Sequence, residues 1–283
     1  MSEGGIIMQE RYLELDKERK IHYLYWENPG KPKILFLHGI TANAGYFEDI
    51  FGFFKKNYEI YATDFAGHNK SYVKNGYYPL EDYIQDTYDF YNTLIKEKCF
   101  IIGYSMGGRV ALWMTIEHPE IAEKLVIVDV APDIDPEGLD MLIKAHKALP
   151  EYFKNYDDLK NYLRKYRGIV NDNYLKVQMK HYWKKNNDGN LVPNYDRDIW
   201  NVTLEKVHEE CSYIKKGVPS ITVPVLIIRG EYSMLLSRKD AESFAAMLKH
   251  GKLVEIAGTT HGVFSEESEK CSAIINRFLV TPS

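Results

Sequence analysis

Hydrophobic positions along this chain fall into two kinds of run, one typical of strands and one typical of helices. Short continuous apolar runs, bounded by turn residues, indicate strands buried on both faces. Runs with apolar residues three and four positions apart indicate amphipathic helices. The predicted strands cover residues 6–15, 19–27, 33–38, 58–63, 99–104, 124–130, 224–229 and 252–256. The predicted helices that accompany them cover residues 46–56, 80–97, 106–118, 238–249 and 266–279.

The order of these elements predicts the fold class. Residues 6–15 and 19–27 alternate apolar and polar positions around a turn at Asp16-Lys17, so they are expected to form an antiparallel hairpin. After the hairpin, strands alternate with helices, which favours parallel pairing with helices covering both faces of the sheet. The sequence therefore predicts an α/β protein with a mostly parallel, eight-stranded sheet.

Residues 133–218 interrupt this alternation. They contain no convincing buried strand, only helical patterns broken by Pro150, Gly168 and the turn-rich stretch 186–190. We interpret them as a helical lid of roughly 85 residues inserted into a core domain made of residues 1–132 and 219–283. Aromatic rings between residues 160 and 185 are expected to line a pocket beneath this lid. The four helices predicted in the insertion cover residues 137–149, 157–167, 172–185 and 198–215.

Composition narrows the possible partners and the compartment. The chain is 45% hydrophobic, and its 36 basic and 40 acidic residues leave a net charge of only −4. This balance does not favour a nucleic-acid or membrane partner. Cys99, Cys211 and Cys271 have no metal-ligand spacing and are expected to stay reduced. Because the N-terminus lacks the pattern of a signal peptide, we expect a soluble cytoplasmic protein.

The sequence that surrounds Ser105 has the form G-x-S-x-G, between an apolar strand and a helix-forming run. In this setting the serine occupies a sharp turn, and the glycines at positions 103 and 107 avoid side-chain collisions. The start of the following helix directs free amides toward the reacting group. Ser105 is therefore a candidate nucleophile.

Several segments together resemble the α/β-hydrolase superfamily over about residues 20–280, and within it the small bacterial carboxylesterases that carry a helical lid. The segments that carry the resemblance are Phe36-Leu37-His38-Gly39, Asp64 to Ser71, Gly103 to Gly108, Val128-Asp129-Val130-Ala131-Pro132 and Arg229-Gly230-Glu231-Tyr232-Ser233. The resemblance implies a serine–histidine–acid triad on a doubly covered sheet, with the serine before the histidine in the chain.

The remaining two triad positions follow from this resemblance and from the strand order. His261 lies in a loop after the strand 252–256, at the sheet edge where Ser105 emerges, so it is the candidate base. The commonest superfamily position for the acid is Ser233 here, which is not acidic. Two carboxylates remain, Asp129 at the end of strand 124–130 and Glu231 just after Gly230. We favour Asp129, because its apolar strand neighbours bury it and a buried carboxylate needs a partner.

Backbone amides would stabilise the oxyanion. The resemblance implies an oxyanion hole formed by the N–H groups of Met106, which follows the nucleophile, and Ile40, which follows His38-Gly39. His38 is expected to orient this loop rather than to react. Asp64, Gly67 and His68 are expected to form a structural turn.

Three functions fit these residues. The favoured one is hydrolysis of a small-molecule carboxylic ester or thioester through an acyl-Ser105 intermediate, which needs no cofactor and no metal. G-Y-S-M-G-G-R also resembles a menaquinone-pathway lyase, in which basic residues hold substrate carboxylates; Arg109 would matter in that case. The third function is that of a ligand sensor, which keeps the triad but does not turn over a substrate. The natural substrate and the oligomeric state stay open.

Overall fold

The computed structural model describes residues 8–167 and 171–281. The first positions of the predicted strand 6–15, the N-terminal residues considered as a signal peptide, and the predicted break at Gly168 fall wholly or partly outside that range. Eight strands form one sheet in the order β1-β2-β4-β3-β5-β6-β9-β10. The strands are β1 (Gln9–Glu14), β2 (Lys20–Trp26), β3 (Lys33–Leu37), β4 (Glu59–Thr63), β5 (Cys99–Tyr104), β6 (Ala122–Val128), β9 (Val225–Gly230) and β10 (Gly251–Ile256).

The pairing of the strands confirms the predicted sheet. Strands β1 and β2 pair antiparallel, and β2 pairs antiparallel with β4. The pairs from β4 to β10 across the sheet are all parallel. Parallel strands end at the same edge, so the loops that follow β5, β6, β9 and β10 meet there.

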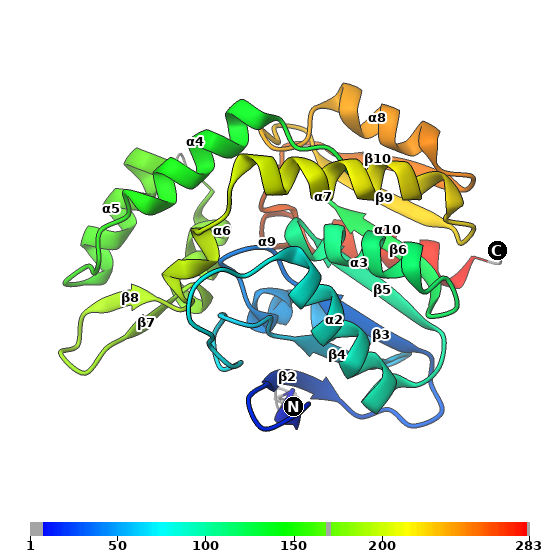
Figure 1. The fold of residues 1–283 in the computed structure, drawn as a ribbon, viewed down its shortest axis with the longest axis horizontal. Helices are drawn as coiled ribbons and strands as arrows, with labels where there is room; N and C mark the ends of the chain where they lie inside the picture. Colours follow the sequence, from blue (N-terminus) through cyan, green and yellow to red (C-terminus); the bar gives the residue numbers. More distant parts are fainter. Residues whose placement is uncertain (1–7, 168–170, 282–283) are drawn as a thin grey trace, which may run out of the picture.

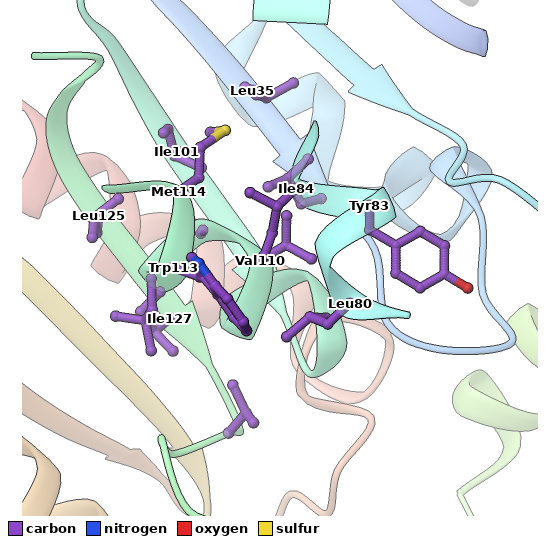
Figure 2. Packing of buried hydrophobic residues seen from close by; sticks show 14 of the residues in the cluster. Leu35, Leu80, Tyr83, Ile84, Ile101, Val110, Trp113, Met114, Leu125 and Ile127 are labelled. Carbon is purple, nitrogen blue, oxygen red and sulfur yellow. The ribbon is translucent and has the colours of Figure 1, made fainter. Parts of the chain in front are cut away.

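Two hydrophobic cores, one on each face of the sheet, explain why the central strands are apolar at consecutive positions. In β3, Leu35 and Leu37 join one core, while Ile34 and Phe36 join the other. Strand β6 divides in the same way, and Figure 2 shows its residues Leu125 and Ile127 on the face that carries α2 and α3. Because alternate side chains point to opposite faces, the central strands β3 and β6 supply both cores and have no polar face.

Helices cover both faces of the sheet (Figure 1). Helices α2, α3, α7 and α8 contribute buried residues to the core in Figure 2, and α1, α9 and α10 contribute to the other core. The bounds are α1 (Glu48–Phe54), α2 (Leu80–Phe90), α3 (Met106–Glu117), α7 (Leu204–Gly217), α8 (Arg238–Met247), α9 (Val263–Glu266) and α10 (Ser268–Val280). Two shorter turns, η1 (Ala44–Phe47) and η2 (Tyr91–Ile95), precede α1 and follow α2.

The segment between β6 and β9 corrects one prediction. It contains α4 (Pro136–Lys147), α5 (Tyr156–Arg167), α6 (Asp172–His181), η3 (Arg197–Trp200), α7 and η4 (Val218–Ser220), but also a strand pair. Strands β7 (Trp183–Lys185) and β8 (Leu191–Pro193) form a hairpin beyond one end of the main sheet (Figure 1). The role of this segment as a lid stays a prediction.

Local hydrogen bonds explain where the predicted helices fail. The predicted helix 172–185 ends at His181, and the side chain of Asn186 accepts hydrogen bonds from the backbone amides of Asp188 and Asn190, which closes the hairpin turn. The predicted helix 198–215 is also divided. Its second part, α7, starts where Thr203 Oγ1 accepts the amide of Lys206 at 3.2 Å, an N-cap.

Two further observations concern the chain as a whole. The three cysteines are buried free thiols, as expected from their number and spacing. Among the described residues, no helix has the combined length and hydrophobicity needed to cross a membrane.

Candidate active site

Ser105 occupies the sharp turn between β5 and α3. Its backbone has φ 52° and ψ −120°, a conformation that a residue with a side chain adopts only under strain. The turn is tight enough that a side chain at Gly103 would collide with the carbonyl oxygen of Gly107. One at Gly107 would collide with the carbonyl oxygen of Leu37 on the neighbouring strand. The glycines around Ser105 are therefore required by close backbone contact, as the motif predicts.

The loop after β3 lies directly against this turn. A Cβ atom at Gly39 would be 3.1 Å from Ser105 Cβ and 3.0 Å from the ring of Tyr104. The next residue, Ile40, lines the same cavity as Ser105 and Met106. Met106 is the first residue of α3, so its N–H has no partner within the helix. The two amides predicted for the oxyanion hole thus come from segments that flank Ser105.

Two buried histidines hold the loop after β3 in place. His38 Nε2 accepts the amide of Phe65 at 3.0 Å, and its Nδ1 lies 2.8 Å from the carbonyl of Gly39, to which it donates. His68 Nε2 accepts the amide of Thr41 at 3.3 Å. Burial lowers the pKa of His38 to about 4 and that of His68 to about 3, so both rings are neutral at physiological pH. Both histidines are therefore structural supports, as expected.

Asp129 is almost completely buried immediately after β6, at 1% exposure. Its carboxylate accepts three hydrogen bonds: from the amide of Gly230 at 3.0 Å, from Ser233 Oγ at 2.5 Å and from His261 Nδ1 at 2.7 Å. These partners explain how an ionised group is tolerated in this position. The residue has φ 54°, and its own amide donates to the carbonyl of Ile228 in β9.

His261 is held by the loop that follows β10. Thr260, the preceding residue, donates both its amide and its hydroxyl to Glu266 at 2.6 Å, which fixes the end of this loop to α9. The imidazole also lies beside the ring of Tyr104, with 4.9 Å between the ring centroids. Its side chain is 21% exposed, so the ring is reachable from the solvent side while Nδ1 is occupied by Asp129.

The two alternatives for the acid position are separated by geometry. Glu231 does not pair with His261; its Oε2 accepts the amide of Gly258 at 2.8 Å, within the loop before the histidine. Ser233, at the position where the acid is commonest, donates its hydroxyl to Asp129 instead. The same hydroxyl oxygen accepts the amides of Leu235 and Leu236, both at 3.2 Å. The sequence marks Ser233 only as a missing acid, because its role depends on a contact between two separate loops.

The structure brings together most of the predicted site. Ser105, Asp129, Ile40 and Met106 line one cavity of about 120 Å³, and Asp129 connects that cavity to His261. Within residues 8–167 and 171–281, no hydrogen bond joins the Ser105 hydroxyl to His261. Such contacts are often long before substrate binds.

The walls of the cavity differ from what the sequence predicts. Among the residues that the structure describes between 160 and 185, no aromatic ring lines it. Tyr162, Tyr182 and Trp183 pack instead against the core that contains α1 and α10. The wall contributed by the segment between β6 and β9 comes from α4, η3, α7 and the loops beside them: Ile134, Leu139, Leu142, Ile199, Trp200, Val202, Val207 and Glu210.

A wider cavity lies elsewhere, between β2, α1 and α6. It measures about 650 Å³, and His22, Lys70 and His181 are among the residues that line it. None of the predicted catalytic or oxyanion-hole residues reaches it, so the smaller cavity is the candidate active site.

The doubly covered sheet, the strained serine between β5 and α3, and the histidine loop after β10 define an α/β hydrolase. A model of the family described as serine aminopeptidase, S33, matches residues 28–268. The chain belongs to this family, and it is a hydrolase of the α/β type.

Individual relatives agree with this classification. The chain is 26% identical over 254 residues to a 2-(acetamidomethylene)succinate hydrolase of Mesorhizobium japonicum, covering 89% of this chain and 90% of the relative. It is 25% identical over 261 residues to a 3-hydroxybutyrate-oligomer hydrolase of Cupriavidus necator, with 86% and 87% covered.

Solved structures share the fold. An E-2-(acetamidomethylene)succinate hydrolase superimposes with a TM-score of 0.86 at 23% identity, over 97% of this chain and 100% of the other. An esterase of M. tuberculosis does so with a TM-score of 0.80 at 20% identity, over 98% and 94%.

Proposed function

We propose that this protein hydrolyses carboxylic esters or thioesters of small molecules through an acyl-Ser105 intermediate. The observation that carries the proposal is the 2.7 Å contact between His261 Nδ1 and Asp129, made beside the cavity that Ser105 enters. A carboxylate at Nδ1 fixes the imidazole so that Nε2 is the nitrogen that can take a proton.

The mechanism follows from the position of each group. His261 accepts the Ser105 proton as the hydroxyl oxygen bonds to the carbonyl carbon, and Asp129 stabilises the imidazolium that forms. The amides of Ile40 and Met106 donate to the oxyanion of the tetrahedral intermediate. His261 then gives its proton to the leaving alcohol or thiol. Water, deprotonated by the same imidazole, releases the acid and restores Ser105. These steps use side chains, amides and water, so we expect no cofactor.

The polar lining of the cavity supports an ester rather than a peptide substrate. An aminopeptidase substrate carries a free ammonium group, for which a carboxylate is the natural partner. Within the described part of the chain, the carboxylates that line the cavity are those of Asp129 and Glu210. Asp129 is occupied by three donors, and Glu210 is paired with Arg109 at 3.1 Å. The same pairing disfavours the lyase, because Arg109 is not an unpaired cation waiting for a substrate carboxylate. The relatives named as an esterase and as a hydrolase of hydroxybutyrate oligomers support the same substrate class.

Covalent labelling tests the proposal directly. A fluorophosphonate probe should label the protein at Ser105, and the purified protein should hydrolyse p-nitrophenyl acetate or butyrate with rapid turnover. Ser105→Ala should remove both signals without unfolding the protein. Ser272→Ala is the matched control, because this buried serine on α10 does not line the cavity.

Two outcomes would contradict ester hydrolysis. Labelling together with turnover below about one per minute, far under the usual enzyme range, would favour the ligand sensor. Release of pyruvate from the menaquinone intermediate, with no ester cleaved, would favour the lyase.

A further inference from the structure

The loop between β10 and α9 carries His261 and is held in two separate halves. In the first half, the amide of Gly258 donates to Glu231 Oε2 at 2.8 Å, which ties this half to the loop after β9. In the second half, the contacts run to α9 through Glu266. The histidine lies in the second half, so Glu266 rather than Glu231 is the carboxylate that can control its position.

Glu266 holds Thr260, the residue immediately before His261, through both of its carboxylate oxygens. Thr260 donates its amide to Oε2 and its hydroxyl to Oε1, each at 2.6 Å. A hydrogen bond to an ionised carboxylate is stronger than one between neutral groups, and two such bonds to one residue fix its orientation as well as its position. A movement of Thr260 would therefore break one or both contacts.

The residue after His261 is fixed by the same short helix. The carbonyl of Gly262 accepts the amides of Ser265 and Glu266, both at 2.9 Å. The amide of Gly262 donates to Thr260 Oγ1 at 3.4 Å. The chain from Thr260 to Glu266 thus closes on itself, and His261 lies inside the closed segment.

The helix α9 gives this closed segment a rigid base. Val263 and Phe264 are buried, at 0% and 1% exposure, in the core that contains α1 and α10. The ring of Phe264 also packs against Tyr104, the residue before the candidate nucleophile, with 6.1 Å between the ring centroids. Glu266 therefore connects the histidine loop to the part of the core that also supports the serine turn.

We infer that Glu266, by holding Thr260, is a positioning residue for His261. Its contacts keep the imidazole against the carboxylate of Asp129, which has two further donors and so does not follow the ring when the loop shifts. A displacement of about 1 Å in a catalytic group can cost about 10²-fold in rate. This inference rests on the proposed function, because it takes His261 to be the catalytic base.

Steady-state kinetics with p-nitrophenyl butyrate test whether Glu266 acts on the reaction. Glu266→Gln keeps the shape of the side chain but replaces one acceptor oxygen by an NH2 group, which cannot accept either donor of Thr260. We expect kcat to fall by about tenfold to a hundredfold, because the base is displaced, with KM within about twofold of the original value. Glu231→Gln is the matched control at the carboxylate that binds the other half of the loop. It should stay within about threefold of the original protein, because glutamine still offers an oxygen to the single amide of Gly258.

Two variants of Thr260 separate the hydrogen bonds from a general effect of substitution in this loop. Thr260→Val keeps the shape of the side chain but removes the hydroxyl donor, so kcat should fall by about threefold to tenfold. Thr260→Ser restores the donor and should remain within about twofold of the original protein. Thermal melting verifies that each variant is folded at the temperature of the assay.

A readout without substrate distinguishes this inference from the proposed function. The Nδ1 proton that His261 donates to Asp129 should give a proton NMR signal far downfield, assigned by its absence in His261→Gln. The buried pair of His22 and Asp64, with 2.6 Å between Nδ1 and Oδ2, should give a second such signal, which serves as an internal reference. In Glu266→Gln we expect the first signal to weaken or disappear and the second to stay, whether or not the protein cleaves esters.

Several results would overturn the positioning role. They are a kcat for Glu266→Gln within about threefold of the original value, an unchanged His261 signal in that variant, and a Thr260→Ser variant as slow as Thr260→Val. A KM that rises as much as kcat falls would assign Glu266 to substrate binding instead. An original protein without the His261 signal would contradict the contact on which the inference depends. Absence of ester turnover in the original protein contradicts the proposed function, and the NMR signals then still decide the role of Glu266.

Discussion

Asp129 and Arg109 are both buried, charged and in contact with the same cavity, but their surroundings differ. Asp129 accepts hydrogen bonds from a backbone amide, a serine hydroxyl and an imidazole. Arg109 donates through a single nitrogen and leaves Nε without a partner among the described residues. A charge whose hydrogen bonds are all made by the protein is fixed and positions its partners. Arg109 is instead held through its ion pair with Glu210, so its position depends on one partner.

The largest effect should follow from removing the charge of Asp129. Asp129→Asn keeps the shape of the side chain but no longer stabilises an imidazolium at His261. We expect kcat for p-nitrophenyl butyrate to fall at least a hundredfold and as much as about 10⁴-fold. Glu231→Gln is the matched control and should stay within about threefold of the original protein. If instead the Glu231 variant lost activity and the Asp129 variant kept it, the acid would be reassigned.

The second prediction concerns the buried ion pair between Arg109 and Glu210, which should contribute to the stability of the fold. Arg109→Leu leaves Glu210 buried without a compensating charge, so urea denaturation should give a free energy of unfolding lower by about 3–5 kcal/mol. Replacing both residues by leucine should restore much of that loss. A double variant less stable than Arg109→Leu would mean that Glu210 does not depend on Arg109.

A third prediction concerns His38 and His68, the buried histidines that hold the loop after β3 and, like Asp129, have protein partners. The pKa of His38 is lowered to about 4 by burial, so the unfolded chain takes up a proton at higher pH than the folded protein. Stability from this group is complete above about pH 6.5 and is lost as the pH falls toward 4, by about 3 kcal/mol.

Chemical denaturation between pH 7 and pH 4 measures this loss. His38→Gln should flatten the pH dependence of unfolding relative to the original protein, even though it lowers stability at neutral pH. An unchanged slope would show that His38 does not titrate between the folded and unfolded states as its burial implies.

The smallest effect is expected for one of the three donors to Asp129. Ser233→Ala removes a hydrogen bond to the carboxylate but leaves His261 and Gly230 bound to it. We expect kcat to fall by roughly tenfold, the value of one hydrogen bond to a charged group. Ser272→Ala, measured in the same assay, controls for the loss of a buried hydroxyl. A loss as large as that of Asp129→Asn would mean that the carboxylate is held mainly by Ser233.

The sheet and the serine turn could be predicted because their signals are local. The apolar runs of β3, β5 and β6 supply two cores at once, which leaves no other way to bury them. Gly103 and Gly107 mark the turn, because a side chain at either position would collide with backbone. Ser105 follows β5 and His261 follows β10. Because both strands belong to the parallel part of the sheet, the two residues lie at the same sheet edge.

The segment between β6 and β9 could not be predicted as well, because its structure depends on contacts between distant residues. The sequence pattern predicts that the helix continues through Tyr182 and Trp183 to residue 185. In the structure both rings pack in the core that contains α1 and α10, and the chain turns back through a hairpin at Asn186. The cavity wall comes from α4 and α7, whose helical pattern does not reveal which face is docked. The partnership of Ser233 with Asp129 is equally invisible, since it joins two loops far apart in the sequence.

The position of two leucines on α4 has a consequence for how the size of the cavity can change. Leu139 and Leu142 form part of the cavity wall but are only partly buried, on a helix outside the sheet. Like Met106 in the same wall, both leucines pack against the core that contains α2 and α3. Smaller residues at these two positions would widen the cavity without changing a residue of the sheet. If the protein hydrolyses esters as proposed, single substitutions on this outer helix would therefore be enough to change the length of substrate that it accepts.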